Sequence, residues 1–157
     1  MTLRWLAYAL VGVAVMIAGM FVAARFMDGP LGIIPGGTFR SGEPATYPAK
    51  WSFAEPIETI EMQLDAGDTS RNTWILVHGD GAYIPASLSF PPGKTWHLEA
   101  DQEGAAQLRI ERRLYDVTLR RISDTELATQ LTTTLETKYA TGAPGDAGYW
   151  FFAVDPR

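Results

Sequence analysis

The chain has 157 residues, of which 46% are hydrophobic and 20% are charged, and this composition is typical of a globular protein rather than a disordered one. The length leaves room for one domain and a short additional element. Thirteen basic residues stand against eighteen acidic ones, so the net charge is −5. This acidic balance argues against nucleic acid as a partner, because binding to a phosphate backbone needs a basic face.

The first feature along the chain is an uncharged run from Trp5 to Ala24, which Arg4 and Arg25 close at its two ends. About twenty apolar residues form a helix long enough to cross the hydrocarbon core of a bilayer. Aromatic residues flank the run, as expected where rings settle at a membrane interface: Trp5, Tyr8, Phe21 and Phe26. Residues 1–26 are therefore predicted to be a transmembrane anchor, with membrane lipid as its partner.

A cleaved signal peptide is the alternative for this segment, because residues 22–24 have the form of a cleavage site. The apolar run is longer than the roughly 7–15 residues of a signal h-region, which favours the anchor. Small residues four apart, such as Ala14 and Ala18, would allow the helix of a membrane-protein partner to pack closely. A very short N-terminal tail favours an N-in, C-out topology, which in a bacterium places the domain in the periplasm. The chain has no cysteine, which excludes disulfides but is compatible with either compartment.

Residues 27–56 are rich in glycine and proline, and they are predicted to be a linker that sustains neither a helix nor a central strand. The apolar residues Leu31, Ile33 and Ile34 indicate that this linker lies against the domain or the membrane surface. Trp51 and Phe53 then introduce the folded part.

Residues 57–157 are predicted to form one domain. Approximate alternation of apolar and polar residues, β-branched runs and turn signals predict strands. These strands are expected over 57–64, 73–78, 82–87, 107–112, 115–122 and 149–154. A hairpin turn is expected at 78–81 and a tight turn near Arg113, and Pro85 requires an edge or a bulge in its strand.

Two helices are expected among these strands. One runs over 94–102 with Trp96 as its anchor, and the other begins with Ser123 as N-cap and ends near Tyr139. Glu126 stands three residues after Ser123, as in a capping box. The predicted fold is therefore mainly β with flanking α: a small barrel of about six antiparallel strands with two or three helices, preceded by one transmembrane helix.

Known catalytic motifs are absent from the sequence. It contains no HExxH pattern, nucleophile elbow, Walker A loop or GxGxxG fingerprint. The two histidines, His78 and His97, are interpreted as surface or hydrogen-bonded residues, and Glu58 and Glu61 as solvated residues of a strand. A group of arginines is interpreted as a solvated strand face: Arg109, Arg112, Arg113, Arg120 and Arg121. No metal site is predicted.

The candidate ligand site consists of residues that the hairpin at 78–81 could bring to one end of the barrel. They are Arg71, Asn72, Tyr83, Ser87, Lys94 and Trp96. Trp96 and Tyr83 can stack on a flat ligand, and Arg71 and Lys94 can meet an anion. The alternative is that Trp96 only fills the core.

The order of the segments TWILVHGDGAYIPAS (73–87), KTWHLEADQEGAAQLRIERRLYDVTLRRISDTE (94–126), LETKY (135–139) and a closing strand resembles the split β-barrel superfamily of pyridoxamine phosphate oxidase and deazaflavin-dependent nitroreductases. The chain is most similar to members with an N-terminal membrane helix and a PLG-x-IPGG segment, which is residues 30–37 here. The resemblance implies a cofactor such as FMN or a deazaflavin. In the flavin-binding relatives a phosphate site lies where Arg71, Ser87, Ser89 and Lys94 stand here. Many relatives pair into a homodimer, and this chain is left open between monomer and dimer.

Two functions follow from the sequence. The first is a non-catalytic accessory or ligand-binding domain, tethered beside a membrane-protein complex so that its effective concentration there is high. The second is a flavin- or deazaflavin-dependent oxidoreductase whose protein part orients the cofactor. The first is favoured because the sequence offers few donors for a cofactor phosphate.

Overall fold

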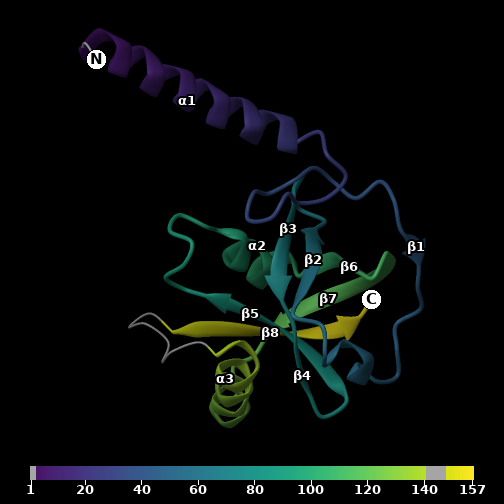
Figure 1. Ribbon diagram of the computed structural model, residues 1–157. Helices are drawn as coiled ribbons and strands as arrows, with labels where there is room; N and C mark the ends of the chain where they lie inside the picture. Colours follow the sequence, from purple (N-terminus) through teal and green to yellow (C-terminus); the bar gives the residue numbers. More distant parts are fainter. Residues whose placement is uncertain (1–2, 141–147) are drawn as a thin grey trace.

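A curved, almost entirely antiparallel sheet forms the body of the fold (Figure 1). Two helices lie against this sheet, and a third, N-terminal helix extends away from it. The computed structural model describes residues 3–140 and 148–157. The strands are β1 (Glu43–Pro44), β2 (Thr59–Leu64), β3 (Ser70–Trp74), β4 (Leu76–His78), β5 (Gly81–Ser87), β6 (Ala105–Ile110), β7 (Arg113–Arg121) and β8 (Tyr149–Pro156). The helices are α1 (Leu3–Ala24), α2 (Trp96–Glu103) and α3 (Thr125–Tyr139), with a 3-10 turn η1 at Ser52–Ala54. The prediction of a mainly β fold with flanking helices is confirmed.

The strand order is β3-β2-β6-β7-β8-β5-β4, and β1 adds a short parallel pairing to β7. The two ends of this path, β3 and β4, are consecutive in the chain and are separated only by Ile75. The sheet therefore curls until its first and last strands meet at one residue. Sequence analysis predicts a single strand over 73–78, but the structure divides this segment because β3 pairs with β2 and β4 pairs with β5.

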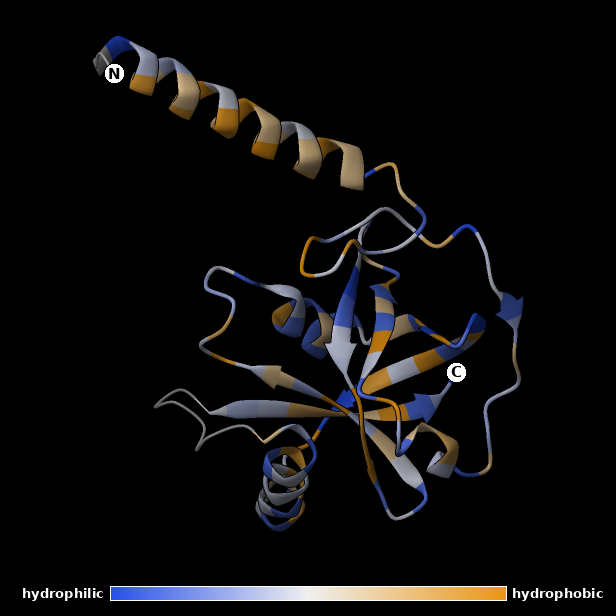
Figure 2. Cartoon of the chain, viewed as in Figure 1, coloured by the Kyte–Doolittle hydropathy of each residue, from blue (hydrophilic) through white to orange (hydrophobic). Residues whose placement is uncertain are grey.

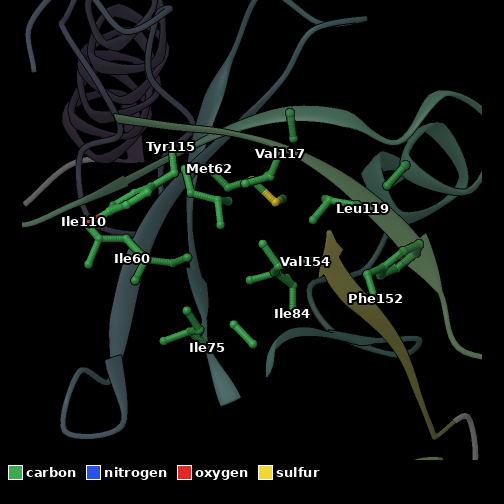
Figure 3. Close-up of a cluster of buried hydrophobic side chains, with 14 of the residues drawn as sticks. Ile60, Met62, Ile75, Ile84, Ile110, Tyr115, Val117, Leu119, Phe152 and Val154 are labelled. Carbon is green, nitrogen blue, oxygen red and sulfur yellow. The ribbon is translucent and has the colours of Figure 1, made fainter. Parts of the chain in front are cut away.

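The core lies inside this curled sheet (Figure 3). Alternate residues of each strand point inward, as the two-residue repeat of a strand requires. In β2, for example, Ile60, Met62 and Leu64 are all buried. Aromatic residues such as Phe152, from β8, complete the filling. This alternation is the pattern that the sequence shows most clearly.

Helix α3 covers the outer face of the sheet at β4 and β8. Leu131 and Leu135 are fully buried there against Leu76 and Phe151. The expected N-cap was Ser123, but the cap is Asp124, whose side chain accepts hydrogen bonds from the backbone N–H groups of Glu126 and Leu127. Both residue types cap well, and the helix begins one residue later than the capping box predicts.

The turn between β6 and β7 lies at Glu111 and Arg112 rather than near Arg113, which already belongs to β7. Both turn residues have positive φ, 48° and 70°, as a two-residue hairpin turn requires. Neither is glycine or asparagine, so the usual turn signal is missing. Pro85 lies where expected, because the pairing of β4 with β5 extends no further than Tyr83 and the neighbour of Pro85 in the described sheet is β8.

Residues 27–56 are mostly irregular, yet they pack closely on the barrel. Trp51 is 1% exposed and packs on Tyr115 of β7 with the ring centroids 5.5 Å apart. The Tyr47 hydroxyl donates to the Val154 carbonyl at 2.7 Å. This segment, called the connector below, therefore contributes side chains to the core of the barrel.

Helix α1 extends away from the barrel, and hydrophobic residues follow it along its length (Figure 2). All side chains from Arg4 to Ala23 are exposed. Its length and composition are sufficient to cross a membrane, as the sequence predicts; a signal sequence would meet the same criterion. Nothing in the barrel covers its apolar surface, in contrast to α3, which buries a leucine stripe.

Candidate functional site

The structure brings two of the predicted ligand residues together. The Arg71 guanidinium of β3 lies 5.8 Å from the ring centroid of Trp96, the first residue of α2. Trp96 is 6% exposed and belongs to the core, where it packs near Phe152. Burial lowers the pKa of Arg71, although the nearby Glu99 carboxylate opposes this effect. Trp96 therefore packs in the core and also contacts the half-buried guanidinium of Arg71.

A second group of predicted residues lies in the loop between β5 and α2. The Ser87 hydroxyl accepts hydrogen bonds from the backbone N–H groups of Phe90 at 3.1 Å and Ser89 at 3.4 Å. The Lys94 ammonium donates to the Phe90 carbonyl, and burial lowers its pKa. These polar groups hold the loop in shape.

The remaining two predicted residues lie elsewhere. Tyr83 is on the opposite face of β5 from the buried Ile84, and it packs against the cluster of Leu131 and Phe151 beneath α3. The sequence predicts that the Tyr83 and Trp96 rings lie together at one end of the barrel. The structure separates them, because Trp96 belongs to the inner core and Tyr83 lies on the outer face of the sheet. The Asn72 side chain donates to the Gly32 carbonyl of the connector at 2.9 Å.

A groove at the start of β8 is a further candidate site for a ligand. Its volume is about 600 Å³, and its lining comes from α2, the end of β7, α3 and β8. The lining residues are Asp101, Arg121, Ile122, Ser123, Ala128, Tyr149, Trp150 and Phe151. Five of these residues are apolar or aromatic and three are charged or polar, so the surface of the groove is mixed in character.

One cation lies over the aromatic part of this groove. The Arg121 guanidinium is 3.4 Å from the ring centroid of Trp150 and donates to the Asp101 carboxylate at 3.1 Å. His97 meets the same tryptophan ring edge-on at 5.2 Å. Burial, together with the charges of Lys94 and Arg121, lowers the pKa of His97. This lowered pKa favours the neutral form of His97, and its Nδ1 is buried without a hydrogen-bond partner in the described part of the chain.

The groove suits a flat or largely apolar ligand with one polar or anionic group. The Trp150 and Tyr149 rings provide aromatic surface. The Arg121 side chain is 40% exposed and pairs with Asp101 through one nitrogen, so its other N–H groups can donate to a polar or anionic group. Within residues 3–140 and 148–157, no cluster of three or more His, Asp or Glu side chains could hold a metal ion. The sequence pattern predicts that Arg121 lies on a solvated strand face, and it gives no signal for Trp150. The strand YWFFAV is apolar at every position, so its sequence does not reveal which of its aromatic residues reaches the surface.

A second polar centre joins the connector to the barrel. Arg109 of β6 forms ion pairs with Asp28 at 2.9 Å and with Glu61 of β2. It also donates to the Ser41 carbonyl at 3.1 Å, and its side chain is 10% exposed. We call this set the Arg109 clamp. The sequence interpretation of Arg109 as a solvated residue is wrong, because Asp28 folds back over it from a position 81 residues away.

The clamp lies beside a hollow of about 380 Å³, whose lining includes Asp28, Ser41, Glu61 and Arg109. The charged groups at its centre are already paired with one another, so we assign the hollow a structural role. A scan against models of known protein families finds no match for this chain, and a search of curated proteins finds no similar sequence.

Proposed function

We propose that the chain is a membrane-tethered, non-catalytic accessory or ligand-binding domain that works beside a membrane protein. The observation that carries this proposal is the exposed apolar helix α1 joined to a well-packed barrel. The side chains from Arg4 to Ala23 are all exposed. Exposure of so large an apolar surface to water is energetically unfavourable. A bilayer would cover this surface, and small residues along α1 would allow a partner helix to pack there.

The connector supports a tether that holds the barrel in place. The Gly37 N–H donates to the Ala24 carbonyl at the end of α1 (3.2 Å), and Gly36 and Ser70 exchange two backbone hydrogen bonds. A side chain at Gly36 would meet the Gly29 carbonyl oxygen, 1.7 Å from the ideal Cβ position. The close approach of these backbones explains the consecutive glycines of the IPGG segment. The Arg109 clamp then secures the connector to β2 and β6.

Ligand binding is assigned to the groove of Arg121 and Trp150. The resemblance to flavin-binding barrels instead favours the loop of Ser87 and Lys94, but there the hydroxyl of Ser87 and the ammonium of Lys94 already bind the loop backbone. A cofactor phosphate would have only the Ser87 O–H and the two remaining Lys94 N–H groups as donors from these side chains. A non-catalytic role therefore agrees better with the hydrogen bonding than a flavin-dependent one does.

Membrane attachment is tested by washing membranes that contain the full chain with alkaline carbonate. We expect the chain to stay in the pellet, and release into the supernatant would contradict the tether.

A Gln130→Cys variant tests topology, because the chain has no native cysteine and Gln130 is exposed on α3. With the barrel outside the inner membrane, a membrane-impermeant maleimide should label this variant in cells whose outer membrane alone is permeabilised.

A flavin- or deazaflavin-dependent oxidoreductase is the second candidate, and one observation favours it. The buried Arg71 Nε has no hydrogen-bond partner in the described residues, although it lies beside Trp96. Titration of the detergent-solubilised chain with FMN and with the deazaflavin cofactor, followed by tryptophan fluorescence, separates the two candidates. We expect no saturable quenching at micromolar cofactor. Saturable quenching that Arg71→Gln weakens would favour the oxidoreductase.

A further inference from the structure

A short hairpin in the connector presents an apolar residue at its tip. Leu31 and Ile34 exchange two backbone hydrogen bonds of 3.0 Å, and Gly32 and Ile33 form the turn between them. The Ile33 residue is 99% exposed, and Leu31 is 43% exposed. Turns of this kind usually carry polar residues or glycine. An isoleucine held almost completely in solvent therefore needs an explanation.

The exposure of Ile33 does not come from a loose loop end. The Asn72 side chain of β3 donates to the Gly32 carbonyl at 2.9 Å, inside the turn itself. Just after the hairpin, Gly36 pairs with Ser70, whose hydroxyl also donates to the Gly37 carbonyl at 2.6 Å. The side chain of Ile34, the other end of the hairpin, is buried, in contrast to that of Ile33. The barrel thus holds the hairpin so that Ile33 points away from it.

The hairpin lies close to the end of α1. Its base meets the helix through the hydrogen bond from Gly37 to the Ala24 carbonyl. Figure 1 shows the connector folded between α1 and the start of β3, and Figure 2 shows hydrophobic segments in this part of the chain. Two further exposed apolar residues, Phe26 and Met27, follow α1 after the charged residue Arg25. The apolar surface of the helix therefore continues onto the connector.

We propose that the hairpin of residues 31–34 is a second lipid contact, in which Ile33 and Leu31 enter the interfacial region of the bilayer. This inference rests on the proposed membrane anchoring by α1. An apolar tip beside a membrane-spanning helix gains free energy by leaving water. Two separated points of contact fix the tilt of the barrel relative to the bilayer, whereas one helix alone leaves the tilt free. The groove of Arg121 and Trp150 is then presented at a defined height and angle.

The experiment places a fluorescent probe on single cysteines in the full chain, reconstituted in vesicles of phosphatidylcholine and phosphatidylglycerol. The variants are Ile33→Cys in the hairpin, Met16→Cys in the middle of α1, and Gln130→Cys on α3, which lies far from α1 in Figure 1. Lipids with a nitroxide at the headgroup or deep in the acyl chain report the depth of each probe. We expect deep quenching at Met16, shallow quenching at Ile33 and none at Gln130.

The outcomes separate the hairpin from the anchor. Quenching at Met16 without quenching at Ile33 would overturn the second contact and leave the anchor intact. Absence of quenching at both positions would overturn both. A second test leaves the tip of the hairpin without a probe. It compares Ile33→Ser with Ile33→Leu, each in the Gln130→Cys background, and measures energy transfer from a label at residue 130 to the bilayer surface. We expect a broader distribution of distances between residue 130 and the bilayer for Ile33→Ser only, because serine removes the apolar tip and leucine keeps it. Equal distributions for the two variants would contradict the proposal.

Discussion

At the scale of single residues, Arg109 has the largest set of polar contacts to the connector. Its guanidinium reaches the side chain and carbonyl of Asp28, the carbonyl of Ser41 and the carboxylate of Glu61. Its ring-stacking partner is Phe39, whose centroid lies 4.4 Å away. The hydrogen bond from Arg109 to Glu61 and the one to Asp28 raise the pKa of the guanidinium, although burial opposes them. Only a planar group with several donors can serve all these partners at once.

We expect Arg109→Ala to destabilise the chain by about 2–3 kcal/mol. This lies below the 3–5 kcal/mol typical of a broken buried ion pair, because the Asp28 and Glu61 side chains are each about a third exposed and keep some hydration. Urea unfolding of the full chain in a mild detergent measures the change. Arg113→Ala, at an exposed position of the same sheet, should cost less than about 0.5 kcal/mol. Equal losses of unfolding free energy for the two variants would show that the contacts of Arg109 do not stabilise the fold.

Asp28 makes the clamp sensitive to acid. Burial opposes its ionisation, but hydrogen bonds from Ser41, the Arg40 backbone and Arg109 outweigh burial and lower the pKa of Asp28 to about 2. An unfolded aspartate has a pKa of about 3.9, so its contribution to stability is complete above that pH and is lost as the pH falls toward 2. We expect wild type to exceed Asp28→Asn in unfolding free energy at pH 6, with the difference shrinking between pH 4 and 2. A constant difference would contradict this linkage.

At the scale of elements, the end of α3 holds the point where β3 becomes β4. The Tyr139 hydroxyl lies 2.6 Å from the Glu58 carbonyl and 2.9 Å from the Ile75 carbonyl, and it accepts the Ile75 N–H at 3.1 Å. The Lys138 ammonium binds the carbonyls of Ile57 and Ile75 at 2.6 and 2.9 Å. Ile75 lies outside both strands, so these side chains take the place of a strand neighbour. The helix end thus closes the curled sheet.

Tyr139→Phe should destabilise the chain by about 1–3 kcal/mol, because the Ile75 N–H loses its partner. The Ile75 carbonyl keeps Lys138, and the stack on Trp74, at 4.3 Å between centroids, is also kept. Thermal or urea unfolding measures the change. Thr133→Ala on the exposed part of α3 should change stability by less than about 0.5 kcal/mol. A loss for Tyr139→Phe no larger than for Thr133→Ala would show that the hydroxyl has no closing role.

The same hydroxyl predicts a weakness in alkali. Burial raises the pKa of Tyr139 to about 12, although the hydrogen bond with the Ile75 backbone opposes this effect. The folded-state pKa then exceeds the unfolded value of about 10, so the contribution is complete below pH 10 and lost as the pH rises toward 12. The stability difference between wild type and Tyr139→Phe should therefore shrink across this window. If it grows instead, the tyrosine is ionised more easily in the fold.

At the scale of the whole molecule, the chain divides its hydrophobic surface between two uses. The barrel buries its apolar residues inside the sheet and beneath α3, whereas α1 leaves its apolar residues exposed. The barrel contacts the helix only through its last residues, as Ala24 is buried while the preceding residues are not. Its core is complete without α1.

Deletion of residues 2–23 should therefore yield a soluble barrel that unfolds cooperatively, while the full chain needs detergent. Keeping Ala24 retains the carbonyl that receives the Gly37 N–H. Partition between detergent and aqueous phases, together with circular dichroism, gives both readouts. If the shortened chain still enters the detergent phase to the same extent as the full chain, α1 is not the source of membrane affinity.

The sequence alone determined the elements whose signals are local. The uncharged run gives α1, the alternation in IETIEMQL gives β2, and the leucine spacing gives the buried stripe of α3, because each pattern is a repeat within one contiguous segment. A glycine turn at 79–80 likewise gives the hairpin of β4 and β5. These features depend on local backbone geometry and burial, which the pattern of residues within one short segment indicates directly.

Only the tertiary structure decided which distant residues meet. Asp28 reaches Arg109 across 81 positions, and Lys138 reaches Ile57 across the same separation, so no local pattern announces either contact. The separation of Tyr83 from Trp96 depends on which face of β5 turns inward, and the groove at Trp150 depends on where β7 ends beside β8. Pairing register and curvature of a sheet arise from contacts between strands, and these contacts are formed only when the chain has folded.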